Sequence, residues 1–140
     1  MGNLTQKVTQ NLVAAWNSTN LGRIGELYVD DAVVRHPMSP VPLRGRKAVV
    51  DLESGMFGAF SDVAWRLEGT VSEGDRLVVE FAVAATNTGP LPSPNGPIPP
   101  TGRRIEVRGA SVLRLTPEGQ IAEEHRHVDV AGMMAQLGLT

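Results

Sequence analysis

The stretch from Arg108 to Thr140 constrains the fold most, because it encodes a strand, a tight turn, a second strand and a short helix in succession. The turn is marked by Thr116-Pro117-Glu118-Gly119, where proline presets φ and glycine takes a positive φ. Two of the three histidines follow the turn. Alternation of side chains places one set of residues on a single face: Ile121, Glu123, His125, His127 and Asp129. A face so rich in titratable groups either contacts solvent or lines a polar cavity.

Further strands precede this stretch. Residues 77–85 alternate apolar and other side chains, and the turn Ser72-Glu73-Gly74-Asp75 joins them to a shorter alternating run at 63–67, which predicts a hairpin. Residues 103–115 form the next long strand, with an apolar face and a mostly charged face. Between these strands, residues 89–102 contain six prolines and cannot form a regular element.

Helical periodicity occupies the N-terminal half and the end of the chain. Apolar stripes predict a first helix carrying Val8, Leu12, Ala15 and Trp16, a second over 21–29, and a third over 46–60. The apolar stripe of the third helix consists of Val49, Leu52, Met56, Phe57 and Phe60. A short strand over 32–36 and a loop over 37–45 separate the second and third helices. A final helix starts at Asp129 and ends at Gly138.

This order predicts an α+β fold in one domain spanning residues 1–140. Its curved mixed or antiparallel sheet is wrapped by the N-terminal helices, as in an α+β barrel. A curved sheet wrapped by helices encloses a cone with one open end, and such a cone is a natural small-molecule pocket.

Composition excludes several classes of function. The formal net charge of −2 gives no electrostatic footprint for nucleic acid or an anionic membrane surface. There is no cysteine, so disulfides and thiolate metal sites are excluded. No apolar run approaches the roughly 18 residues of a membrane span. A cytoplasmic location is the default expectation.

Several segments carry a family resemblance. LGRIGELYVDDAVVRHP followed by PLRGRKAVVDL resembles the opening of the NTF2-like, ketosteroid-isomerase-like superfamily. The pieces PPTGRRIEV, LRLTPEGQIAEEHRHVD and MMAQLG resemble, more narrowly, the SnoaL-like polyketide cyclases. The resemblance spans residues 5 to 139, and it implies the cone fold, a homodimer, and no organic cofactor or metal.

Only some catalytic positions carry over by resemblance. Where ketosteroid isomerases have a carboxylate base, this chain has His36, and the positions of their oxyanion donors are Leu12 and Ser111. The resemblance therefore argues against steroid isomerase activity. Limonene-epoxide-hydrolase-like members need an Asp-Arg-Asp set around a water, which the sequence alone does not assign. SnoaL-like aldol cyclases use a pocket aspartate helped by a histidine, for which Asp129 beside His125 is the nearest match.

Candidate catalytic residues are thus His36, His125 and Asp129. A histidine with a pKa near neutrality suits proton transfer, and a neighbouring carboxylate would orient it. Asp129 also suits a structural role as a helix N-cap, and the His-x-His pair could instead bind zinc or iron. The candidate ligand-binding residues combine apolar and hydrogen-bonding side chains: Trp16, Met56, Phe60, Trp65, Asn87, Ser111 and His127.

The leading hypothesis is a cofactor-independent enzyme that performs acid/base chemistry on a small apolar or aromatic carbonyl compound, by aldol cyclisation or isomerisation. His36 or His125 would be the base, Asp129 would orient it or exchange protons, and Ser111 or Asn87 would hydrogen-bond the enolate oxygen. The alternative is a non-catalytic small-molecule-binding or assembly protein of the same fold. Catalysis by histidine predicts a titration near pH 6 to 7, which binding of a neutral ligand does not.

Overall fold

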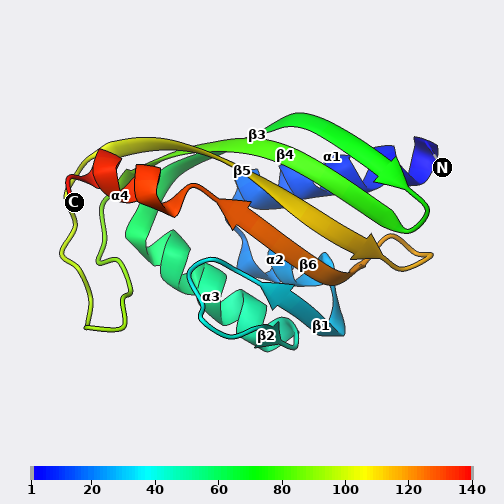
Figure 1. Ribbon diagram of the computed structural model, residues 1–140, viewed down its shortest axis with the longest axis horizontal. Helices are drawn as coiled ribbons and strands as arrows, with labels where there is room; N and C mark the ends of the chain where they lie inside the picture. The colour runs from blue at the N-terminus through cyan, green and yellow to red at the C-terminus, as the bar shows by residue number, and fades with distance from the viewer. Residues whose placement is uncertain (1, 140) are drawn as a thin grey trace.

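A computed structural model describes residues 2–139 of the chain, and the side chains of residues 4–139. It contains four helices and one six-stranded sheet (Figure 1). The helices are α1 (Gly2–Ser18), α2 (Leu21–Glu26), α3 (Arg46–Ala59) and α4 (Val130–Leu137). The strands are β1 (Tyr28–Arg35), β2 (Leu43–Arg44), β3 (Phe60–Glu73), β4 (Arg76–Asn87), β5 (Arg104–Leu115) and β6 (Ile121–Val128).

The strand order is β2-β1-β6-β5-β4-β3, and the sheet is curved and not closed. Only β1 and β6 pair in parallel, whereas the other neighbours are antiparallel. Two bulges interrupt the pairing of β3 with β4, after Ser61 and after Leu67. Bulges bend a strand and increase its twist, so β3 curves along the sheet edge. The predicted α+β class and mixed sheet are confirmed.

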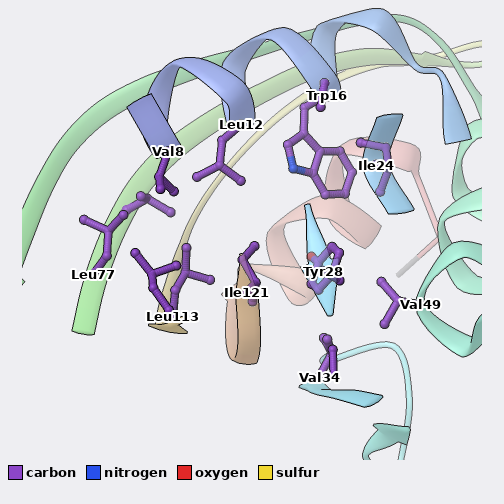
Figure 2. Packing of buried hydrophobic residues seen from close by; sticks show 14 of the residues in the cluster. Val8, Leu12, Trp16, Ile24, Tyr28, Val34, Val49, Leu77, Leu113 and Ile121 are labelled. Carbon is purple, nitrogen blue, oxygen red and sulfur yellow. The ribbon is translucent and has the colours of Figure 1, made fainter. Parts of the chain in front are cut away.

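The helices fill the inside of this curve. Val8, Leu12 and Trp16 of α1 belong to the same buried cluster as inward side chains of β4, β5 and β6, among them Leu77, Leu113 and Ile121 (Figure 2). Asn17 fastens the end of α1 to the edge strand, because its Nδ2 donates to the Trp65 carbonyl at 2.9 Å and its Oδ1 accepts from the Trp65 N–H at 2.8 Å.

The alternation predicted for the long strands is confirmed. Leu77, Val79, Phe81 and Ala85 of β4 are buried, as are Ile105, Val107, Ser111, Leu113 and Leu115 of β5. The turns at Gly74 and Gly119 have positive φ, of 58° and 88°. Helix α4 begins after the N-cap residue Asp129 and ends at the C-cap residue Gly138, whose φ is 77°.

Two boundary predictions and one burial prediction are wrong. The second helix stops at Glu26 rather than residue 29, and Tyr28 instead begins β1, where it pairs with Ile121 of β6. Long-range pairing thus overrides the local helical periodicity. The predicted loop over 37–45 contains the two-residue strand β2, which pairs with Val33 and Val34. On α3, Glu53 is buried together with Val49 and Ala59, whereas the predicted Leu52 is only partly buried.

The proline-rich loop, residues 88–103, is tied to the body of the molecule by Asn87. Its Nδ2 donates to the carbonyls of Ala59 and Gly89, each at 3.0 Å. Its Oδ1 accepts from the backbone N–H and the hydroxyl of Thr101, at 2.8 and 3.0 Å. Leu91 is buried in a second apolar cluster with residues of α4 and β5. Within the described residues, no helix is long and apolar enough to cross a membrane.

Candidate functional site

A cavity of about 130 Å³ lies between the inner face of the sheet and the helices α1, α3 and α4. It separates the two apolar clusters, taking walls from both. Most of its lining is apolar, and the polar lining groups are few: Tyr28, His36, Glu53, Ser111, Glu124 and Arg126. An apolar pocket with a few convergent polar groups is the usual form of a small-molecule site.

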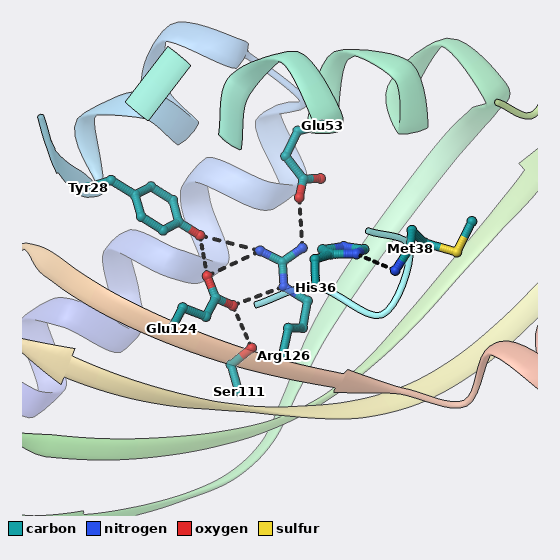
Figure 3. A network of polar contacts seen from close by, with 7 residues as sticks. All are labelled: Tyr28, His36, Met38, Glu53, Ser111, Glu124 and Arg126. Atoms are coloured by element: carbon teal, nitrogen blue, oxygen red, sulfur yellow. Dashed lines mark hydrogen bonds and ion pairs between the residues drawn. The ribbon is translucent and has the colours of Figure 1, made fainter. Parts of the chain in front are cut away.

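The centre of the polar group is Arg126, an inward residue of β6 (Figure 3). Its Nε and Nη2 contact the two oxygens of Glu124 at 2.9 and 3.2 Å, and its Nη1 donates to Glu53 at 2.7 Å. Its guanidinium carbon also lies 4.9 Å from the ring centroid of Trp16, a distance at which a cation is attracted to an aromatic face. Arg126 therefore bridges two buried carboxylates.

The carboxylate of Glu124 accepts hydrogen bonds from two hydroxyl groups as well as from Arg126. Ser111 donates to Oε2 at 2.6 Å, and the Tyr28 hydroxyl donates to Oε1. Although burial opposes ionisation, Arg126 and these two hydroxyls outweigh it and lower the pKa of Glu124 to about 2. Burial raises the pKa of Tyr28, so its hydroxyl keeps the proton that it donates. Glu124 is therefore a fixed anion.

Glu53 differs because only one of its oxygens is engaged. Figure 3 shows it reaching from α3, with one carboxylate oxygen on Arg126 and the other turned away. Among the described residues, that second oxygen has no hydrogen-bond partner, although only 4% of the side chain is exposed. Burial raises the pKa of Glu53 above its ordinary 4.5, with Arg126 opposing the rise and Glu124 adding to it. Two carboxylates on one guanidinium thus have pKa values displaced in opposite directions.

His36 follows β1 and contributes an uncharged imidazole to the cavity wall. Its Nδ1 accepts a hydrogen bond from the Met38 N–H at 3.0 Å, which puts the ring proton of the neutral form on Nε2. Burial, together with repulsion from Arg126, lowers the pKa of His36 to about 3. Near neutral pH the side chain is therefore a hydrogen-bond donor through Nε2, and only a weak proton acceptor.

The other two predicted catalytic residues do not line the cavity. His125 is exposed on the outer face of β6, and Asp129 caps α4 by accepting from the Gly132 N–H at 2.9 Å. The expectation that Ile121 shares a face with His125 is wrong, because the β5–β6 pairing shifts register between Arg114 and Leu115. The shift leaves Ile121 buried and turns Glu124 and Arg126 inward in place of the histidines.

His127 is also exposed and stands beside His125, with ring centroids 4.1 Å apart. Both line an outer groove with Arg35 and Pro37, and this groove adjoins the cavity at His36 and Arg126. In the part of the chain that the structure describes, no three or more His, Cys, Asp or Glu side chains are grouped to hold a metal ion.

The predicted ligand-binding residues divide into two groups. Trp16, Met56, Phe60, Trp65 and Ser111 line the cavity. Asn87 lies outside it, and the four hydrogen bonds of its side chain join the proline-rich loop to the Ala59 carbonyl. Ser111 gives its hydroxyl proton to Glu124, so that proton is not available for an enolate oxygen.

Sequence reasoning missed Tyr28, Glu53, Glu124 and Arg126. Two signals could have found part of this set. Glu53 stands four residues after Val49, on the apolar stripe of α3, where a charged residue requires a buried partner. Ser111 is the polar exception among the inward residues of β5, and it pairs with Arg126 in the sheet. Strand alternation alone could not choose between the two polar faces of β6.

Comparison with known proteins gives a consistent relationship. The chain matches the model of the SnoaL-like domain over residues 9–124. No curated protein matches significantly. Three solved structures share the fold. TsrD from Streptomyces laurentii is 21% identical, with a TM-score of 0.83, covering 99% of this chain and 97% of its own. A candidate SnoaL-like polyketide cyclase from Jannaschia sp. CCS1 is 17% identical, with a TM-score of 0.84 and coverages of 99% and 94%.

IdmH from Streptomyces antibioticus, a candidate polyketide cyclase, is 25% identical, with a TM-score of 0.78, covering 96% of this chain and 98% of its own. These likenesses agree with the fold described above. The family model covers most of the chain, including most of the residues that line the cavity. The chain therefore belongs to the SnoaL-like domain family.

Proposed function

We propose that this protein is a cofactor-independent enzyme of the polyketide-cyclase-like type, which moves a proton on a carbonyl-containing small molecule. The observation that carries the proposal is Glu53, a buried carboxylate with a raised pKa and one unengaged oxygen in an apolar cavity. A general base is most effective when its pKa approaches the working pH. Burial raises the pKa of Glu53 and so brings it closer to a neutral working pH.

In the proposed reaction, the carboxylate of Glu53 accepts a proton from the carbon next to the substrate carbonyl. The electrons of that C–H bond form the enolate C=C bond, and the carbonyl oxygen takes the negative charge. The enolate then attacks a second carbonyl in the same molecule, giving an aldol ring closure, or is reprotonated at another carbon. Glu53 returns its proton to the new alkoxide or to that carbon, so no external acid, oxidant or metal is required.

His36 is proposed as the donor to the developing enolate oxygen. Its Nε2–H faces no partner among the described residues, and its lowered pKa keeps the ring neutral. A donor preorganised in a site of low dielectric stabilises an oxyanion without having to reorganise. This assignment revises the sequence-based one, in which a histidine is the base.

Glu124 and Arg126 are proposed as positioning residues. Arg126 holds Glu53 in place at 2.7 Å, and Glu124 holds Arg126 through two contacts. The order Glu53–Arg126–Glu124 resembles in type the carboxylate-guanidinium-carboxylate set of limonene-epoxide-hydrolase-like proteins. Epoxide opening of that kind needs a protonated acid as well as a base. Both oxygens of Glu124 are already engaged by Tyr28, Ser111 and Arg126, which counts against Glu124 as either group.

The test is exchange of ketone α-protons for deuterium in D2O, followed by NMR. Acetophenone is a suitable first probe because it has exchangeable α-protons and no other reactive carbonyl. Glu53→Gln should lower the enzyme-dependent exchange rate by about 100-fold or more. Asp51→Asn is the matched control, since Asp51 is an exposed carboxylate on the same helix, paired with Lys47. Equal rates in Glu53→Gln and wild type would refute the assignment of the base.

The non-catalytic alternative makes a different prediction. If the protein only binds ligands, wild type should bind the ketone and show no exchange above the buffer rate, and Glu53→Gln should behave in the same way.

The expected homodimer rests on the family resemblance. On the outer sheet face, Arg66 and Arg108 pair with Glu68 and Glu106, and sedimentation at several concentrations would test whether two copies associate.

A further inference from the structure

The aromatic side chains of this chain are all gathered at one place. The sequence has two tryptophans, one tyrosine and three phenylalanines, and all six line the cavity: Trp16, Tyr28, Phe57, Phe60, Trp65 and Phe81. The other members of the two apolar clusters are aliphatic residues and methionine. A concentration of flat π surfaces around a single cavity favours a ligand that offers a flat face in return.

These aromatic walls are held by several contacts. Trp65 stacks on Phe81, with centroids 5.3 Å apart and planes 22° apart, and both backbone groups of Trp65 are bonded to Asn17. Trp16 meets Phe57 edge to face at 5.9 Å and 70°, and it lies beside the guanidinium of Arg126. These packed rings fix the aromatic walls of the cavity, which would not move without disrupting the contacts between them.

The cavity is small. The cavity volume is about 130 Å³, whereas a dry engineered cavity of about 150 Å³ accepts one benzene molecule. One six-membered ring therefore occupies the space available, and a second fused ring requires the walls to move. A substituent of the ring can leave past Pro37, which is exposed and lines both the cavity and the outer groove.

The polar residues of the lining also determine how a ligand is oriented in the cavity. Glu53 and His36 both flank Arg126 (Figure 3), so the proton acceptor and the free donor lie at the same polar part of an otherwise apolar wall. A carbonyl attached to the ring would be drawn to this part, with the ring against the aromatic side chains.

We infer that the substrate is a planar, single-ring carbonyl compound and not a fused polycyclic one. The inference rests on the proposed function for the carbonyl and its α-proton, and on the cavity alone for the ring. Binding affinity tests the ring size, and α-proton exchange tests the proton transfer. Either part of the account can therefore be refuted while the other stands.

The experiment uses three aryl methyl ketones that share one acetyl group: acetophenone, 2-acetonaphthone and 2-acetylanthracene. Affinity is measured by calorimetry, and occupancy by the NMR signals of the two indole N–H groups, which belong to Trp16 and Trp65. Non-specific apolar binding strengthens with each added ring. The inference predicts the reverse order, with the naphthyl ketone about tenfold or more weaker than acetophenone because the walls must yield.

Cyclohexyl methyl ketone tests planarity, since it has the same acetyl group on a puckered ring. It should bind about two- to tenfold more weakly than acetophenone, through the loss of aromatic contact. Met56→Ala enlarges the cavity by shortening a half-buried lining residue, and it should tighten binding of 2-acetonaphthone about tenfold. Met134→Ala is the matched control, because Met134 is also half-buried but does not line the cavity, and it should leave the order unchanged.

Affinity that rises from one ring to three, or ketones that shift neither indole signal, would overturn the inference. Tight single-ring binding without α-proton exchange would leave the ligand class standing and remove the proposed function. If the three-ring ketone undergoes exchange and Glu53→Gln loses it, the proposed function would stand and the inferred ligand class would be wrong.

Discussion

Replacing His36 by asparagine should change how the stability of the protein depends on pH. The pKa of His36 falls from an ordinary 6.5 to about 3 in the folded chain, because of burial and the nearby Arg126. Between those two values the unfolded chain carries a proton on this ring that the folded chain does not. Acidification from pH 6.5 therefore favours the unfolded state, by about 1.4 kcal/mol for each pH unit crossed.

The useful range is pH 6.5 to 4.5, which ends at the ordinary pKa of a glutamate, 4.5. Over these two pH units His36 should remove about 2 kcal/mol from the free energy of unfolding, because at pH 6.5 the ring is already half protonated in the unfolded chain. His36→Asn abolishes this contribution and keeps an acceptor for the Met38 N–H. Glu53 acts in the opposite sense, since its raised pKa makes the folded chain gain a proton as the pH falls. That contribution remains in both proteins and cancels in the difference between them.

The assay is urea unfolding of wild type and variant at pH 6.5, 5.5 and 4.5, compared through the extrapolated free energies. Wild type should lose about 2 kcal/mol more than His36→Asn across the range. His125→Asn serves as the control, because His125 is exposed outside the cavity, and it should follow wild type. Parallel curves for wild type and His36→Asn would refute the description of His36 as a buried, neutral ring.

Three further variants test the polar network and the loop. Arg126→Met leaves two buried carboxylates without their cation, so urea unfolding should show a loss of about 3–5 kcal/mol; an unchanged midpoint would contradict the bridging role. Tyr28→Phe removes one donor to Glu124, and calorimetry should show a loss of about 1–3 kcal/mol; a gain in stability would argue against that hydrogen bond. Asn87→Ala frees the proline-rich loop, so limited proteolysis should cut residues 89–102 faster, while acetophenone binding stays as in wild type.

Local patterns predicted most of this fold. The alternation in residues 77–85 and 103–115 identified two strands and their buried faces, because each strand has one apolar and one polar side. The glycines at 74, 119 and 138 marked turns and a helix end through their positive φ. The parallel pairing of β1 with β6 could not be predicted in the same way, since it joins residues about 90 positions apart and gives no local signal.

The site was predicted less well than the fold, for a physical reason. On β6 both faces carry titratable groups, and a register shift beside Leu115 decides which of them enters the cavity. His125 therefore looked catalytic, whereas Arg126 is the residue that reaches Glu53. The aromatic lining was easier to predict, because Trp16, Phe60 and Trp65 lie at apolar positions of helices and strands.

The most direct test of the central claim is the pH dependence of α-proton exchange on acetophenone. Catalysis by Glu53 requires its ionised form, so the rate should rise with pH through one ionisation, at a pH above the ordinary 4.5 of a glutamate. The same rise should survive in His125→Asn and disappear in Glu53→Gln. A rise that persists unchanged in Glu53→Gln would contradict the account and return the role of base to another group.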